Sequence, residues 1–129
     1  MKKELIICIV IIGIILIGNY ITGIYEEKAI KTINNNLEEI KMELEKQEKE
    51  EKIIKKKLEN LKENWNKVYT KLAYFIEHNE LEKVETSIII LTSFCKTKVY
   101  EKAVSEIDKS MFVLNHIQEK DKLKLENIF

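Results

Sequence analysis

Four side chains in the sequence could supply soft metal ligands or a nucleophile: Cys8, Cys95, His78 and His116. A structural metal site usually takes such ligands from closely spaced pairs, for example Cys-x-x-Cys. The sequence has no such pair. In an antiparallel helical bundle His78 and His116 would reach the same end, near several glutamates, so they are weak candidates for a surface metal site. We expect no bound metal and no cofactor.

The two cysteines lie in different sequence environments. Cys8 falls within a long apolar run, and Cys95 falls on the apolar face of an expected helix. They therefore cannot form a disulfide with each other within one chain. We expect Cys95 to pack as a small apolar side chain. A disulfide between two copies is the alternative.

Glycine and proline are scarce, which limits the chemistry available to the chain. The three glycines are Gly13, Gly18 and Gly23, and there is no proline. Phosphate-binding loops, dinucleotide-binding turns and nucleophile elbows need glycine at tight bends.

The 22 basic residues are all lysine and are interleaved with 22 acidic residues, whereas nucleic-acid binding needs a clustered basic face. We therefore expect that the chain is not an enzyme and that it has no small-molecule substrate and no nucleic-acid partner.

Leu5 to Tyr25 form a run of 21 residues without a charged side chain. A helix of this length rises about 30 Å, which matches the hydrocarbon core of a bilayer. Lysines precede the run and glutamates follow it. The positive-inside rule therefore places residues 1–4 in the cytoplasm and residues 26–129 outside, with 5–25 as a single-pass anchor in membrane lipid. A cleaved signal peptide is the alternative, although Ile21-Thr22-Gly23 is a poor cleavage site.

A heptad pattern follows the apolar run and predicts a coiled-coil stalk over residues 26–57. Twelve of fourteen positions spaced alternately three and four apart are apolar, and the exceptions are Gln47 and Glu51. This is the spacing of a coiled-coil seam. The positions expected to form an interaction seam are Ile30, Ile33, Leu37, Ile40, Leu44, Ile54 and Leu58.

The long helix expected from this pattern leaves apolar surface uncovered. It would measure about 70 Å at about 1.5 Å per residue, and the two shorter helices that follow could cover only Leu58 to Phe75. The segment Ile30 to Ile54 would then need a second copy or a neighbouring membrane protein, and self-association is favoured. A single charge-laced helix acting as a passive spacer is the alternative. Asn34-Asn35-Asn36 could interrupt the helix, but we expect continuity.

Residues 58–129 are expected to form an antiparallel three-helix bundle with a C-terminal tail that packs back on it. The helices are predicted over about 58–78, 80–96 and 99–121, with a break at His78-Asn79, where Asn79 caps the second helix. A strand through the β-branched residues near Ile89 is rejected because no partner strand is evident. The core positions, which recur at helical spacing, are Leu61, Trp65, Val68, Leu72, Phe75, Leu81, Val84, Ile88, Leu91, Cys95, Val104, Ile107, Met111 and Leu114.

Two stretches of the second half carry a family resemblance. They are Lys71-Leu72-Ala73-Tyr74-Phe75-Ile76-Glu77-His78-Asn79-Glu80-Leu81-Glu82 and the closing Leu125-Glu126-Asn127-Ile128-Phe129. With them the chain resembles an uncharacterised bacterial family of short, N-terminally membrane-anchored helical proteins, domain of unknown function 4363. The resemblance covers about half of the chain closely and the anchor in outline. It implies that His78 and Asn127-Ile128-Phe129 are family features, and it implies no activity.

These patterns together predict an all-α protein with a transmembrane helix, a long heptad-patterned stalk helix and a three-helix antiparallel bundle. The expected function is that of an extracytoplasmic structural or interaction protein of the cell membrane, which binds itself or a neighbouring membrane protein. A sensory or ligand-binding module is the alternative, and it should contain a roomy polar cavity among its helices. The sequence does not identify the biological process.

Overall fold

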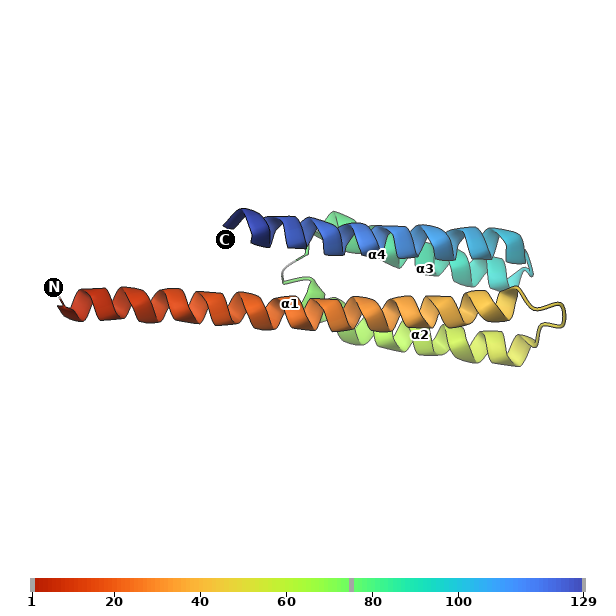
Figure 1. Ribbon diagram of the computed structural model, residues 1–129. Helices are drawn as coiled ribbons and strands as arrows, with labels where there is room; N and C mark the ends of the chain where they lie inside the picture. Colours follow the sequence, from red (N-terminus) through yellow and green to blue (C-terminus); the bar gives the residue numbers. More distant parts are fainter. Residues whose placement is uncertain (1, 75, 129) are drawn as a thin grey trace.

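The computed structural model describes residues 2–74 and 76–128, and in the last helix it describes side chains only as far as Leu123. Within these residues the chain forms four α-helices: α1 (Lys2–Leu44), α2 (Glu51–Leu72), α3 (His78–Lys96) and α4 (Tyr100–Ile128). Figure 1 shows the four helices with their axes aligned along one another. The predicted all-helical class and the long N-terminal helix are confirmed.

The helices form two antiparallel hairpins that pack together as a bundle. α1 pairs with α2, α3 pairs with α4, and α1 also packs against α4. α2 and α3 share the smallest contact among the packed pairs. Most of the first half of α1 extends beyond the bundle, and the end of α4 lies beside the last part of it (Figure 1). The three C-terminal helices thus pack as a bundle, as predicted, and the second half of α1 joins them as a fourth helix.

The predicted stalk over residues 26–57 is wrong, because the chain reverses direction between α1 and α2. α1 ends at Leu44, and residues 45–50 form a loop. Gln47 lies in this loop and Glu51 begins α2, so the two exceptions in the heptad pattern mark the reversal. A continuous rod would leave its apolar stripe in water, whereas the hairpin removes that surface from water. Asn34, Asn35 and Asn36 lie inside α1 and do not interrupt it.

The positions predicted as an intermolecular seam are buried inside one chain. Ile33, Leu37 and Ile40 have 0% of their surface exposed, because α2 and α4 cover this side of α1. Burial of each aliphatic side chain contributes roughly 1.5–3 kcal/mol. The seam therefore gives no reason to expect a second copy. The positions corrected in this way are Ile30, Ile33, Leu37, Ile40, Leu44, Ile54 and Leu58, none more than 6% exposed.

The predicted core positions lie in the same interior. Val68, Val104 and Met111 are half-buried against it, and Phe75 lies outside the described residues. The buried positions are Leu61, Trp65, Leu72, Leu81, Val84, Ile88, Leu91, Cys95, Ile107 and Leu114.

The helix ends differ from the predicted ones where tertiary packing decides them. α2 ends at Leu72 instead of residue 78, which lets Ile76 enter the core at 7% exposure while Tyr74 is 85% exposed. α3 begins at His78, so Asn79 lies within the helix and does not cap it. α4 continues to Ile128 instead of ending near residue 121. The predicted tail is therefore a continuation of α4.

Lys98 turns the chain from α3 into α4 without a glycine. Its φ of 61° lies in the left-handed region that usually selects glycine after a helix. The Val99 N–H donates to the Phe94 carbonyl at 2.9 Å, which closes the last turn of α3. The Lys98 ammonium also pairs with the Glu51 carboxylate at 2.6 Å. This ion pair ties the turn to the beginning of α2 in the other hairpin.

Candidate functional site: the apolar helix and its junction with the bundle

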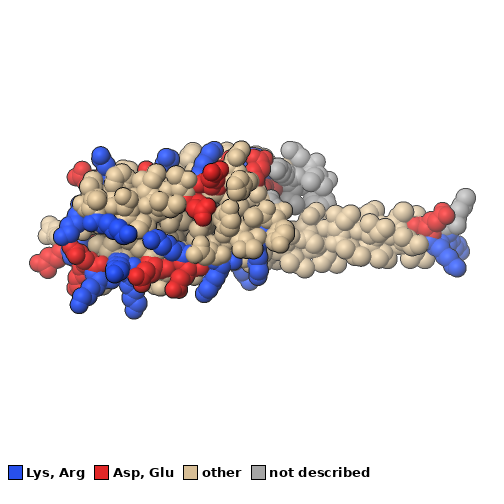
Figure 2. Space-filling view, turned by 180° about the vertical axis from the view of Figure 1, so that it is seen from behind, with Lys and Arg blue, Asp and Glu red and all other residues tan. Residues whose placement is uncertain are grey.

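The first half of α1 is the part of the chain with the strongest functional signal. Its large apolar side chains, from Leu5 to Ile24, are between 37% and 70% exposed. The most apolar window of the helix is 0% buried. Figure 2 shows a rod of uncharged residues between the charged tip of the chain and the charged surface of the bundle. A helix of this length and composition could span a membrane.

Tyr25 marks the point at which α1 enters the bundle. Its ring is partly buried against the core, and the Lys71 ammonium at the end of α2 lies 5.2 Å from the ring centroid. Ala29 and Ile30 follow within the next turns and are buried. In the sequence, Tyr25 is only the last residue of the uncharged run. Its packing shows that the exposed and buried halves of α1 meet without a linker.

A wedge-shaped cavity of about 430 Å³ separates the exposed part of α1 from the end of α4. Side chains of α1 form most of its wall, and three residues of α4 close the other side. Its surface is mainly apolar, although carboxylates and a lysine lie at its edge. The lining residues are Leu16, Asn19, Tyr20, Gly23, Ile24, Glu26, Glu27, Gln118, Asp121 and Lys122.

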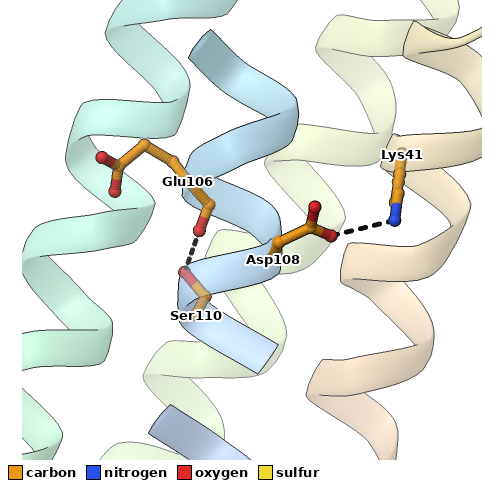
Figure 3. Close-up of polar contacts among 4 residues, drawn as sticks. All are labelled: Lys41, Glu106, Asp108 and Ser110. Carbon is orange, nitrogen blue, oxygen red and sulfur yellow. Dashed lines mark hydrogen bonds and ion pairs between the residues drawn. The ribbon is translucent and has the colours of Figure 1, made fainter. Parts of the chain in front are cut away.

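Two polar contacts fix α4 against α1. The Lys41 ammonium lies 2.9 Å from an Asp108 carboxylate oxygen (Figure 3), and this hydrogen bond raises the pKa of Lys41. The Asn34 side-chain amide donates to the Asn115 side-chain oxygen at 3.5 Å. Both contacts lie at the surface, so they set the register of the two helices more than their stability. The sequence analysis missed both pairs, because only tertiary packing brings the partners together.

Two buried hydroxyls of the bundle interior donate hydrogen bonds within their own helices. The Thr92 hydroxyl donates to the Ile88 carbonyl at 2.8 Å, and the Ser110 hydroxyl donates to the Glu106 carbonyl at 2.9 Å (Figure 3). The Glu106 carboxylate points toward α3 in the same view. Hydroxyls bonded to their own helix in this way do not converge on a common point. Their helical spacing on apolar faces is a signal that the sequence analysis could have used.

Glu43 is a buried carboxylate at the end of α1. It is 2% exposed, and one of its oxygens lies 2.9 Å from the Lys46 ammonium and 3.8 Å from that of Lys57. The hydrogen bond from Lys46 lowers the pKa of Glu43. The Lys57 ammonium also donates to the Glu39 carbonyl at 3.4 Å. These contacts hold the hairpin of α1 and α2 closed and show no substrate-facing chemistry.

The candidate metal ligands do not form a site in the described part of the chain. His78 opens α3 and His116 lies in α4, and both side chains are exposed. Glu77, next to His78, pairs with Lys120 at 3.1 Å. Among the described residues, no group of three or more His, Cys, Asp or Glu side chains could hold a metal ion.

The two cysteines are both free thiols in separate parts of the structure. Cys8 is exposed on the apolar run, and Cys95 is 8% exposed in the bundle core. Burial raises the pKa of the Cys95 thiol to about 11. A thiol with so high a pKa is a poor nucleophile and a poor disulfide partner at neutral pH.

The weak contact between α2 and α3 leaves an open groove of about 440 Å³ at the far end of the bundle. Apolar side chains such as Ile54, Leu58 and Tyr100 contribute to it, and lysines and glutamates surround them. The groove lies on the bundle surface and is not the roomy polar interior cavity expected of a ligand-binding module. Its other lining residues are Glu51, Lys55, Glu59, Lys62, Thr92, Cys95, Lys96 and Lys98.

A family model described as a domain of unknown function, DUF4363, matches residues 20–128. The chain belongs to this family. The match covers the whole bundle and the last residues of the apolar run, and it confirms the resemblance to domain of unknown function 4363. No curated protein and no solved structure matches the chain. Because the family description names no activity, the function has to be inferred from the geometry of the chain.

Proposed function

We propose that the chain is a single-pass membrane protein. Its four-helix bundle is held directly on the outer surface of the cell membrane and acts there as a structural or interaction module. The observation that carries the proposal is the exposed, uncharged stretch of α1 from Leu5 to Ile24. In water, so many exposed aliphatic side chains in one rod would be strongly unfavourable. In a bilayer the same side chains are solvated by lipid, and helical hydrogen bonding satisfies the backbone.

The orientation follows from charge. Lys2 and Lys3 lie at the free end of α1, whereas Glu26 and Glu27 lie where the helix reaches the bundle. The positive-inside rule then keeps the N-terminus in the cytoplasm and places the bundle outside. The poor cleavage site at Ile21-Thr22-Gly23 supports a retained anchor over a cleaved signal peptide.

The partner is proposed to be a neighbouring membrane protein. The reason given by the sequence for self-association, an uncovered seam, no longer applies because that seam is buried within one chain. The passive-spacer alternative loses its basis for the same reason, since it required a long single helix outside the bundle. A ligand-binding module is the second candidate, although the open groove between α2 and α3 would have to bind the ligand at the surface and not in the polar interior cavity that the sequence analysis expected.

Cysteine labelling with a membrane-impermeant maleimide on intact cells tests the anchor and its direction. Glu48→Cys places a thiol in the exposed loop between α1 and α2, and Glu4→Cys places one at the other end of the apolar run while keeping both lysines. We expect Glu48→Cys to be labelled in intact cells and Glu4→Cys only after permeabilisation. The unsubstituted chain, with Cys95 buried, is the matched control.

Three results would contradict the proposal. The reverse labelling pattern would invert the orientation. Recovery of the chain in the soluble fraction would remove the anchor. An intact mass lacking about the first 22 residues would identify the run as a cleaved signal peptide.

A further inference from the structure

The register between α1 and α4 fixes how far α4 reaches along the exposed helix. The pairs Lys41–Asp108 and Asn34–Asn115 are seven residues apart on each helix, so the two helices run antiparallel in constant register. The same register, extended by nine residues toward the C-terminus of α4 and the N-terminus of α1, brings Lys124 level with Tyr25. Ile128, the last residue of α4, then comes level with Ile21, which lies inside the apolar run. Figure 1 shows this end of α4 lying beside the exposed part of α1.

The end of α4 therefore passes the level at which α1 leaves the bundle. Four residues beyond Lys124 correspond to about 6 Å of helix rise. That depth equals the level at which interfacial helices bury their apolar side chains, roughly 5–10 Å into the boundary between headgroups and acyl chains. In the α2–α3 link, Ile76 is buried in the core, whereas Tyr74 is 85% exposed. Among the described helices, only α1 and α4 reach this level.

The composition of this end suits a bilayer interface. Leu123 is 59% exposed although it is a large apolar side chain. The sequence continues with further apolar residues at 125, 128 and 129, and lysines at 120, 122 and 124 stand among acidic residues at 119, 121 and 126. Lysines beside apolar residues can extend their ammonium groups to the headgroups while their stems lie along apolar surface.

We propose that the C-terminal end of α4 seats in the headgroup region of the same bilayer that α1 crosses, as a second membrane contact of the bundle. Lipid then fills the apolar wedge of about 430 Å³ between α1 and α4. Two contacts on different helices restrain the tilt of the bundle, whereas one helix alone would leave it free to rock. The inference rests on the proposed anchor, because the position of the bilayer is set by Leu5–Tyr25.

Lipid is favoured over a protein partner by position. The register places the end of α4 beside the uncharged surface of α1, and a bilayer that covers one of these surfaces must also meet the other. A partner protein would have to bind at this depth while leaving α1 in lipid. Contact with a protein remains a distinct outcome of the test.

The test uses the full chain reconstituted in vesicles of phosphatidylcholine and phosphatidylglycerol. An environment-sensitive fluorophore is attached to one introduced cysteine at a time, in a Cys8→Ser, Cys95→Ala background whose helicity is first checked against the unsubstituted chain. Leu125→Cys reports the end of α4, Ile12→Cys reports the middle of the apolar run, and Phe112→Cys is the matched control. Phe112 lies on the same helix, is 73% exposed and should stand in water.

Lipids brominated near the headgroup end or near the terminal methyl end of the acyl chains then quench the fluorophores by depth. We expect the fluorophore at 125 to lose most of its emission with headgroup-end bromine, that at 12 with methyl-end bromine, and that at 112 with neither. If position 12 is quenched and position 125 is not, the second contact is refuted while the anchor stands. A blue-shifted but unquenched fluorophore at 125 refutes it as well, because the site is then covered by protein. If position 12 is not quenched, the anchor itself fails.

Discussion

Glu43 is a buried carboxylate whose protonation should affect the stability of the fold. Its carboxylate is buried, and the hydrogen bond from Lys46 lowers its pKa below the ordinary value of 4.5. A lowered folded-state pKa means that the ionised carboxylate stabilises the fold above the unfolded-state pKa. That stabilisation is lost as the pH falls through the folded-state value. Acid should therefore loosen the α1–α2 hairpin first.

Replacement of Glu43 by Gln tests this sign. The unsubstituted chain should lose thermal stability as the pH is lowered below about 4.5, and Glu43→Gln should lose less over the same interval because it has no proton to take up. Melting curves by circular dichroism between neutral and acid pH measure the difference. Glu63→Gln, at an exposed position of α2, is the control. Parallel pH profiles for Glu43→Gln and the unsubstituted chain would contradict the assignment.

Cys95 should be chemically silent while the bundle is folded. With a pKa of about 11, roughly one thiol in a thousand is ionised at about pH 8, and the side chain is also covered. In a Cys8→Ser variant, maleimide labelling should be slow without denaturant and complete with it. Rapid labelling of the folded chain, or a disulfide-linked dimer under mild oxidation, would show that this end of α3 is open.

The buried face of α1 packs against both α2 and α4. A substitution that removes a side chain from this face should therefore lower the stability of the bundle substantially. Leu37→Ala removes a fully buried side chain and should lower the free energy of unfolding of the bundle by about 2–5 kcal/mol. Lys31→Ala, on the exposed side of the same helix, should change it by less than about 0.5 kcal/mol. Urea unfolding followed by Trp65 fluorescence measures both in the reconstituted chain. Equal effects of the two substitutions would mean that α1 does not pack as described.

Periodicity was sufficient to predict the helices and their apolar faces but not the path of the chain. The buried face of α1 and that of α2 follow one heptad register, which is also the pattern of a single long helix. Gln47 and Glu51 were treated as tolerated exceptions, and no glycine or proline marked the turn. The end of α2 depends on Ile76 reaching the core, and the next turn depends on a left-handed Lys98. Both are decided by tertiary contacts that local propensity does not encode.

At the scale of the whole molecule, the long exposed apolar segment of α1 was predictable because it depends on length and charge alone. The junction between the exposed part of α1 and the bundle was not predictable, because it depends on the register of α4 against α1. Membership of the family was also recognisable from two short stretches of sequence. The corrected picture is of a bundle that closes on itself and continues directly into the proposed anchor.

Because the apolar face of α1 is buried within one chain, a cysteine introduced on that face should be protected from reagents in solution. Ile40→Cys places a thiol where the side chain is 0% exposed, whereas the nearby Met42 is 62% exposed. We expect Met42→Cys to react readily with maleimide in membranes and Ile40→Cys to react only after unfolding. Specific disulfide dimers through Ile40→Cys would place the seam between two copies and restore the coiled-coil stalk.

The distance between Lys31 and Asn66 tests the self-covering hairpin most directly. Spin labels at these two exposed positions can be measured by pulsed dipolar spectroscopy on the full chain in lipid nanodiscs, with Cys8→Ser. Antiparallel helices in contact have axes about 8–10 Å apart, so with the label linkers the distance should centre at roughly 10–25 Å. A continuous stalk would separate the same residues by about 52 Å of helix rise, and a distribution centred there would contradict the account.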